Sequence, residues 1–215
     1  MGIYDIFLSN SGPAVHMQAQ CCAAYERHLA RYVNTPMTLL QLGIREGGAL
    51  QMWKKWLGPN ARIVGIDGDP GCARHADEQI IVRTGNGSEA KFLREVVAEL
   101  GSIDVVIDDG SHQMIDMIAS FDFLYERISP NGVYLIQAAH TAYLPSYGGG
   151  LNESGTIIQR FKDLLDELHA NHVHNNALRP TSFTKSTLSM TAYESILVFE
   201  KAIAPNRHFI RTGGY

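Results

Sequence analysis

Residues 103–112 read Ile-Asp-Val-Val-Ile-Asp-Asp-Gly-Ser-His, an apolar run that ends in two carboxylates and a histidine. The β-branched run Val105–Ile107 is typical of a parallel strand buried on both faces, and open α/β sheets bind ligands at the carboxyl ends of their strands. Asp108, Asp109 and His112 would stand at such an end. The alternative is an ordinary Asp-Gly turn with solvated carboxylates. We expect the strand to deliver side chains to a functional loop.

Strand and helix patterns alternate on both sides of this stretch. The expected strands are 38–42, 61–66, 79–83, 103–108, 133–136 and 196–200, and the expected helices are 16–32, 49–57, 91–100, 114–128 and 156–174. Alternating β/α units of this kind predict an α/β fold with a mostly parallel sheet and helices on both faces. A length of 215 residues suits a single domain of this class.

The amino-acid composition limits the kinds of molecule that the protein is expected to bind. The net charge is −4 and no run of five basic residues occurs, which argues against a nucleic-acid surface. The three cysteines, Cys21, Cys22 and Cys72, have neither the number of a disulfide framework nor the spacing of a zinc site. The amino terminus has no leader pattern, and no apolar run reaches the roughly 18 residues of a membrane span. We expect a cytoplasmic protein with a small-molecule substrate, no nucleic acid and no membrane.

A glycine turn follows the first expected strand. Gly43 and Gly47 would let a backbone N–H and a helix N-terminus approach a ligand, while Asp67, which ends the second strand, could accept hydrogen bonds from ribose hydroxyls. The spacing is not the G-x-G-x-x-G of dinucleotide sites. It suits a nucleoside without pyrophosphate, namely S-adenosylmethionine. Asn86 and Gly87 follow the third strand and would lie beside the adenine, although Asn-Gly is also simply a good turn.

Several stretches together resemble a known family. They are residues 40–43 with 47–53, 64–70, 107–112, 140–143 with 148–149, and 193–201. These resemble the macrolide-sugar O-methyltransferases of the mycinamicin and macrocin type and the related cephalosporin-biosynthesis methyltransferases, over roughly residues 16–213. The resemblance implies the class I methyltransferase fold in residues 36–215, with residues 1–35 as a helical segment over the cleft. It also implies O-methylation of a glycosylated, antibiotic-type metabolite. With an exposed first helix, it favours a homo-oligomer.

The resemblance assigns roles to individual residues. His112 takes the place of the base that activates the acceptor hydroxyl, Asp109 that of the first magnesium ligand, and Asp108 turns toward the cofactor. An imidazole is largely neutral at pH 7 and can accept a proton, which suits the first of these roles. The residues expected to bind the cofactor are Gln41, Gly43, Gly47, Asp67, Asn86, Gly87 and Asp108.

The sequence departs from the family at the metal. The other family ligands are a Glu-Asp pair, and these positions hold Gln137 and Ala138. Magnesium prefers carboxylate oxygens, so a site made of Asp109 and Gln137 is incomplete and a bound magnesium ion is doubtful. Three interpretations follow: a metal-independent methyltransferase, a methyltransferase fold repurposed for a cyclisation or rearrangement, and a metal-site mutant of a magnesium-dependent enzyme. Gln41 and Asn86 also replace acids that the family tends to carry.

Substrate contacts are expected from the segments around this strand end. His140 could orient the acceptor or share a metal with Asp109, although a loop cap is equally compatible. Tyr143 and Tyr147 could line the acceptor pocket, with ordinary packing as the alternative. The glycine-rich segment 147–151 is either a mobile cover or a passive linker. Residues 175–190 would also grip the acceptor.

Overall fold

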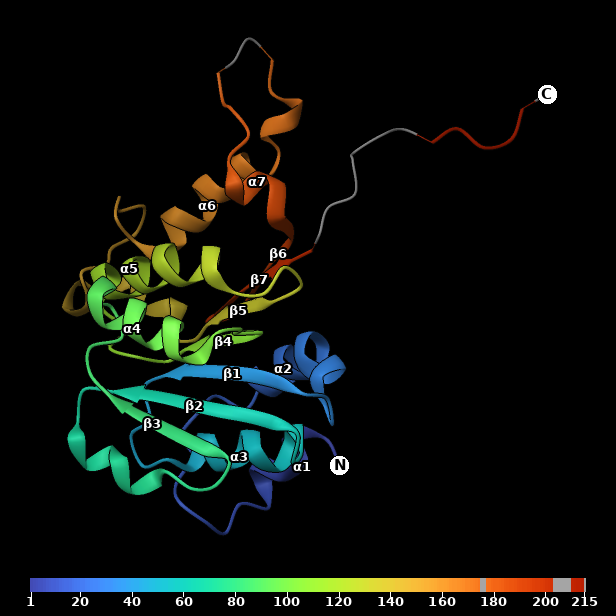
Figure 1. The fold of residues 1–215 in the computed structure, drawn as a ribbon. Helices are drawn as coiled ribbons and strands as arrows, with labels where there is room; N and C mark the ends of the chain where they lie inside the picture. Colours follow the sequence, from blue (N-terminus) through green and yellow to red (C-terminus); the bar gives the residue numbers. More distant parts are fainter. Residues whose placement is uncertain (175–176, 203–209, 215) are drawn as a thin grey trace.

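One seven-stranded sheet organises the chain in the computed structural model, which describes residues 1–174, 177–202 and 210–214 (Figure 1). The strands are β1 Met37–Leu42, β2 Ala61–Asp67, β3 Ile80–Thr84, β4 Val105–Asp108, β5 Val133–Ile136, β6 Thr187–Tyr193 and β7 Ile196–Lys201, in the order β3-β2-β1-β4-β5-β7-β6. Neighbouring strands among β1 to β5 are parallel, whereas β7 runs antiparallel to both β5 and β6. The mostly parallel α/β sheet predicted from the sequence is confirmed.

Helices cover both faces of the sheet. They are α1 Ile3–Leu8, α2 Cys21–Leu29, α3 Gly48–Leu57, α4 Ala90–Leu100, α5 Met114–Leu124, α6 Ile157–Leu168 and α7 Ser182–Ser186. Alternate strand residues feed two apolar clusters: Leu39 lies in the cluster with α1, α2 and α3, whereas Leu40 lies in the cluster with α4 to α7. Figure 1 shows these two helical layers on either side of the strands. Both faces of the central strands are therefore buried, which explains their continuous apolar sequences.

The strand order creates a switch point between β1 and β4. These strands are adjacent and parallel, but β1 leads into α3 on one face and β4 leads into α5 on the other. Leu42 pairs with Asp108 in the register, and the N–H of Asp109 donates to the carbonyl of Leu42 at 3.0 Å. Ligands of open α/β sheets bind at such a point because the two connections diverge there. The loops that start at Gly43 and Asp109 thus meet at one edge.

The N-terminal segment differs from expectation. The helix predicted over 16–32 begins only at Cys21, and its side chains Cys21, Tyr25 and Leu29 are buried in the same cluster as the sheet. One side of α2 therefore packs on an apolar sheet face, while Ala23, Glu26 and Arg27 on its other side are exposed; the predicted start of the helix at residue 16 is wrong. In the described part of the chain, no helix is both long and apolar enough to cross a bilayer.

Candidate active site

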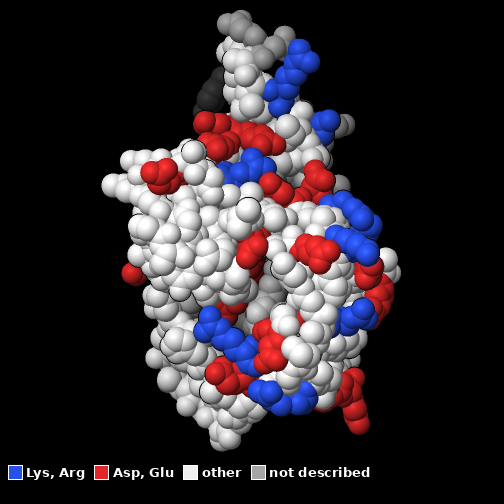
Figure 2. All heavy atoms as spheres, turned by 90° about the vertical axis from the view of Figure 1, so that its left-hand side faces the viewer, with Lys and Arg blue, Asp and Glu red and all other residues white. Residues whose placement is uncertain are grey.

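A cavity of about 330 Å³ lies at the carboxyl ends of the parallel strands. Its lining residues come from the loops after β1, β2, β3 and β4 and from the first turns of α5: Leu42, Gly43, Arg45, Ile66, Asp67, Gly68, Gly85, Asn86, Gly87, Ser88, Asp108, Asp109, Gly110, Ser111, Asp116, Met117 and Ser120. This face of the molecule is hollowed, and both acidic and basic side chains lie around the hollow (Figure 2). The volume falls within the range of small-ligand sites.

The two glycines of the turn after β1, Gly43 and Gly47, have different roles. Gly43 lines the cavity with φ +83°, and a Cβ there would collide with the backbone carbonyl of Asp109. Gly47 has φ +79° and a Cβ there would collide with the ring of His75, but Gly47 does not line this cavity. Only glycine suits such contacts and such a backbone. Gly43 therefore stands where a ligand would approach, whereas Gly47 lets the chain turn into α3.

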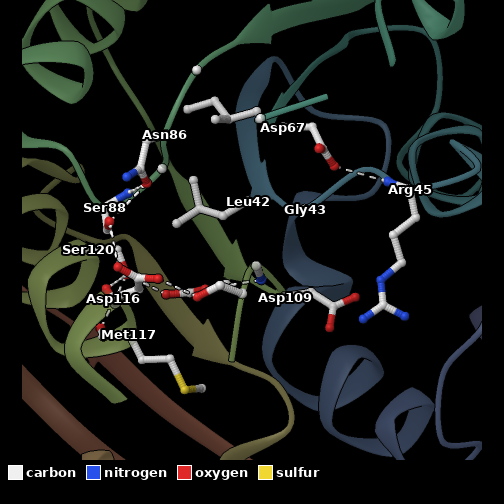
Figure 3. Close-up of a pocket in the computed structure, with 17 residues that line it drawn as sticks. Leu42, Gly43, Arg45, Asp67, Asn86, Ser88, Asp109, Asp116, Met117 and Ser120 are labelled. Carbon is white, nitrogen blue, oxygen red and sulfur yellow. Dashed lines mark hydrogen bonds between the residues drawn. The ribbon is translucent and has the colours of Figure 1, made fainter. Parts of the chain in front are cut away.

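Asp67 organises the β1 turn through its carboxylate. Oδ2 accepts the backbone N–H groups of Ile44 at 2.8 Å and Arg45 at 3.2 Å, and Oδ1 accepts that of Asp69 at 2.9 Å. Partial burial opposes the charged form, but these N–H donors outweigh it and lower the pKa of Asp67. The Asp67 carboxylate is thus held ionised beside the cavity, with lone pairs left for a ligand. Figure 3 shows its bond to the N–H of Arg45.

Arg45 is a site residue that sequence reasoning missed. It lines the cavity, its backbone has φ +51°, and its side chain points toward Asp109 (Figure 3). Its position in the turn, two residues after Gly43, was the one sign in the sequence that Arg45 could reach the site.

Asp116 closes the side of the cavity near Asn86 and was also missed. Its Oδ1 accepts from Ser88 Oγ at 2.8 Å and its Oδ2 from Ser111 Oγ at 2.6 Å, so it joins the loops after β3 and β4. Asn86 Oδ1 in turn accepts the N–H of Ser88 at 2.9 Å and lies 2.8 Å from Ser88 Oγ, whose single proton it shares with Asp116. The Asn86 oxygen is therefore committed within the loop, and its amide nitrogen is the group to offer a ligand. Gly87 lines the same wall, as expected.

Asp108 lies at the back of the cavity, where it is 3% exposed. Its carboxylate accepts from Ser120 Oγ at 2.5 Å, Tyr134 Oη at 3.1 Å and the N–H of Gly110 at 3.3 Å. Burial raises the pKa of Asp108 despite these donors. The predicted orientation of Asp108 toward a cofactor stays a prediction, because most of its bonds fix the loop to α5 and β5.

His112 and Asp109 form a hydrogen-bonded pair. Nε2 of His112 lies 3.0 Å from Oδ1 of Asp109. The backbone of His112 is left-handed, with φ +60°, and its carbonyl accepts from Thr141 Oγ1 at 3.2 Å. The ring of Tyr147 lies 6.5 Å from that of His112 between centroids. An imidazole, a carboxylate and an aromatic side chain thus lie together at the sheet edge.

The predicted metal position lacks the ligands for magnesium. Gln137 is buried and lines, with Asp109, a second cavity of only about 20 Å³. Ala138 follows with a left-handed backbone, φ +53°. Within residues 1–174, 177–202 and 210–214, no three His, Cys, Asp or Glu side chains are grouped to hold a metal ion. One carboxylate, one amide and a methyl group do not fit an ion that requires hard oxygen ligands.

Gln41 supports the site from beneath. It is 2% exposed, its Oε1 accepts from Trp53 Nε1 at 2.7 Å, and its Nε2 donates to the carbonyl of Gly43 at 2.7 Å. It lines the small cavity with Gln137 rather than the main one. Gln41 thus supports the glycine turn, and its expected contact with a cofactor stays a prediction.

The expected substrate residues lie apart from one another. His140 is exposed and its Nδ1 bonds Ser195 Oγ at 2.6 Å, so its ring faces the β6–β7 turn rather than Asp109. Tyr143 is half-exposed, and Tyr147 is the one beside His112.

The glycine-rich segment folds back on the chain before it. Gly149 N–H donates to Leu144 and Gly150 N–H to Ala142. Of the expected 175–190 segment, residues 175 and 176 lie outside the described residues, while α7 and the start of β6 occupy most of the rest.

Comparison with known proteins relates the chain to sugar methyltransferases, although no family model matches it. Over 190 residues it is 35% identical to the 8-demethyl-8-(2-methoxy-α-L-rhamnosyl)-tetracenomycin-C 3′-O-methyltransferase of Streptomyces olivaceus, covering 82% of this chain and 48% of that protein. Over 190 residues it is 30% identical to the mycinamicin VI 2″-O-methyltransferase of Micromonospora griseorubida, covering 82% and 47%. The chain thus spans about half the length of these curated relatives.

A solved structure agrees with this relationship. The MycE methyltransferase of the mycinamycin biosynthetic pathway, in complex with Mg, SAH and mycinamycin VI, matches with a TM-score of 0.84 at 26% identity. The match covers 94% of this chain and 54% of that one. The chain is therefore a homologue of the antibiotic-sugar O-methyltransferases of the mycinamicin and macrocin type, and it carries the class I methyltransferase fold.

Proposed function

We propose that the chain is an S-adenosylmethionine-dependent O-methyltransferase that acts on a hydroxyl of a glycosylated small natural product. The observation that carries the proposal is the meeting of the His112–Asp109 pair and the cavity lined by Gly43, Asp67 and Asn86 at one sheet edge. The relatives are named for O-methylation of sugar-bearing antibiotics, which supports this substrate class.

The cavity fits the cofactor by its donors and acceptors. The backbone of Gly43 borders the cavity at the β1 turn, the Asp67 carboxylate can accept from ribose hydroxyls, and the amide nitrogen of Asn86 can donate to a ring nitrogen of adenine. When bound, S-adenosylmethionine supplies an electrophilic methyl group. The loop residues of this chain would hold that group in line with the acceptor hydroxyl.

His112 is the proposed base. A sugar hydroxyl is a poor nucleophile until its proton is withdrawn, and a positioned imidazole contributes typically 10²–10⁴-fold to such a step. Because Nε2 faces Oδ1 of Asp109, Nδ1 is the nitrogen left to take the proton. The ring of Tyr147, next to that of His112, is proposed to pack against the acceptor sugar. His140 and Tyr143 are proposed to contact the remainder of the acceptor from the segment that follows β5.

Two measurements test the proposal. Calorimetry should show S-adenosylhomocysteine binding at one site, weakened at least tenfold by Asp67→Ala because its carboxylate both orders the turn and meets the ribose. Mass spectrometry with isotope-labelled S-adenosylmethionine and a panel of rhamnosylated polyketides should show methyl incorporation. Binding without any methyl incorporation would favour a non-methylating reaction, and no binding at all would reject the proposed cofactor.

A further inference from the structure

The Asp109 carboxylate is committed to a histidine in this chain. The side chains of Asp109 and His112 are only 20% and 13% exposed, and Oδ1 and Nε2 are 3.0 Å apart. We propose that Asp109 positions His112 as the proton acceptor and that no divalent cation takes part in the reaction. The inference rests on the proposed function, because it states how the acceptor hydroxyl would be activated at that site.

The surroundings of Asp109 disfavour a cation. Asp109 also lines the main cavity of about 330 Å³, but the space that it shares with Gln137 is only about 20 Å³, which is room for about one water. Magnesium gives up its water reluctantly and usually keeps several, so this space does not suit it. The guanidinium of Arg45 also points toward Asp109 (Figure 3), so a positive charge already stands on that side of the carboxylate. Neither Gln137 nor Ala138 supplies a negative charge that would offset the additional positive charge of a cation.

A carboxylate that does not bind a metal ion is available to hydrogen-bond and orient the histidine. Oδ1 of Asp109 lies 3.0 Å from Nε2 of His112, so the carboxylate orients the imidazole directly. During transfer the acceptor oxygen bonds to the methyl carbon while the C–S bond of the cofactor breaks, and the hydroxyl proton passes to Nδ1 of His112. The imidazolium that forms faces Asp109, which stabilises its charge. This arrangement needs no Lewis acid.

Two substitutions should restore the carboxylates that a cation site needs at positions 137 and 138. Gln137→Glu is nearly isosteric, and Ala138→Asp places an acid at φ +53° and ψ +29°, a left-handed backbone that Asp tolerates better than Ala. The double variant should therefore fold. Two matched controls are Ala138→Asn alone, which keeps the side-chain shape without charge, and Asp109→Asn in the double variant, which removes the third carboxylate.

The decisive experiment is titration of the protein with MnCl₂ or MgCl₂ in the absence of cofactor and acceptor. Calorimetry measures the binding, and thermal unfolding measures its effect on Tm. We expect no specific cation binding by the unaltered chain or by Ala138→Asn. We expect one site and a cation-dependent rise in Tm in the double variant, lost when Asp109→Asn is added. One site in the unaltered chain that disappears in Asp109→Asn would overturn the proposal. Failure of the double variant to gain a site would overturn the assignment of Gln137 and Ala138 as the cause.

The positioning role has a kinetic test on whichever glycoside is methylated. Asp109→Asn should lower kcat by about 10²-fold while the acceptor KM stays within about twofold, because the residue orients the base and does not bind the sugar. EDTA should leave the unaltered enzyme unchanged. Activity abolished by EDTA and restored by magnesium would overturn the proposal. Binding of S-adenosylhomocysteine is measured separately, so its absence would count against the proposed function and not against the cation result.

Discussion

At the scale of the residue, the site depends on side chains that hold each other. Asp67 holds the β1 turn, Asp116 joins two loops and Asp109 holds His112. Each of these carboxylates is held by hydrogen bonds to neighbours at the same edge of the sheet, so their positions are set before any ligand arrives. Such preorganisation is what transfer chemistry requires.

Replacement of His112 should separate chemistry from cofactor binding. His112→Ala is expected to lower kcat by about 10²–10⁴-fold because it removes the proposed proton acceptor. The affinity for S-adenosylhomocysteine should stay unchanged, since His112 does not line the main cavity. Initial rates and calorimetry measure the two quantities, with Gln113→Ala as the neighbouring control. Full turnover by His112→Ala would show that another group accepts the proton.

Ala138 stores backbone strain that a single change should release. A left-handed alanine costs about 1–2 kcal/mol relative to glycine, so Ala138→Gly should raise the free energy of unfolding by up to about 1 kcal/mol after the entropy cost of glycine. Urea denaturation measures the change. Ala139→Gly, which follows it and whose φ is not positive, should lose stability instead. A loss of stability in Ala138→Gly would contradict the strain argument.

At the scale of the element, buried strands could be predicted from the sequence more reliably than peripheral elements. The strands β1, β2, β4 and β5 were predicted within about two residues, because strands buried on both faces are continuously apolar. The edge strand β3 is only partly buried but was predicted as closely, because Ile80–Val82 is an apolar run. The strand β6 was missed, because it lies at the sheet edge and Thr187–Tyr193 mixes polar with apolar residues. The short helix α1 was missed because its buried residues contact α2 and α3, a long-range effect.

The site could be predicted only where it follows a strand. The geometry places Asp67, Asn86, Asp109 and His112 at the expected edge, because each comes within four residues of the end of a buried strand. Asp116 could not be assigned, since it lies on the first turn of α5 and reaches the cavity only through the packing of that helix. Their roles in binding and catalysis stay predictions.

Asp77 ties α3 to the start of β3 and makes stability depend on pH. Its burial raises the pKa, but Lys54, Gln51 and the backbone N–H groups of Gln79 and Ile80 outweigh this and lower the pKa of Asp77 from 3.8 to about 2. A depressed pKa contributes stability above pH 3.8, and the contribution is lost as the pH falls to about 2.

Asp77→Asn should therefore be less stable than the unaltered chain at pH 5, and the difference should shrink toward pH 2. Urea denaturation across this range measures it, with the exposed Asp166→Asn as control. A difference that stays constant with pH would show that Asp77 acts through its neutral hydrogen bonds alone.

At the scale of the whole molecule, the cavity and the β6–β7 hairpin occupy different parts of the sheet. The cavity draws on loops after β1 to β4, whereas β6 is the edge strand beyond β7. Figure 1 shows the hairpin on the side of the sheet away from β3. A homo-oligomer stays a prediction, and only the side of α2 that carries the exposed residues Ala23, Glu26 and Arg27 is open to such an interface.

Ligand binding should therefore protect one part of the molecule. Saturating S-adenosylhomocysteine at about 100 Kd should stabilise the fold by about 2.7 kcal/mol and slow hydrogen exchange in residues 43–47, 85–88 and 109–111. Exchange in β6 should change little. Hydrogen-exchange mass spectrometry measures both, and equal protection across the sheet would indicate binding elsewhere.

The close approach of Gly43 to the carbonyl of Asp109 limits how this chain can be engineered. Any side chain at position 43 would displace the loop that carries Asp109 and His112, so a substitution there should change the proposed cofactor binding and the proposed proton transfer together. Gly68, by contrast, lines the cavity with open space around its missing Cβ. Libraries that seek to accept altered cofactors should start at Gly68 and leave position 43 untouched.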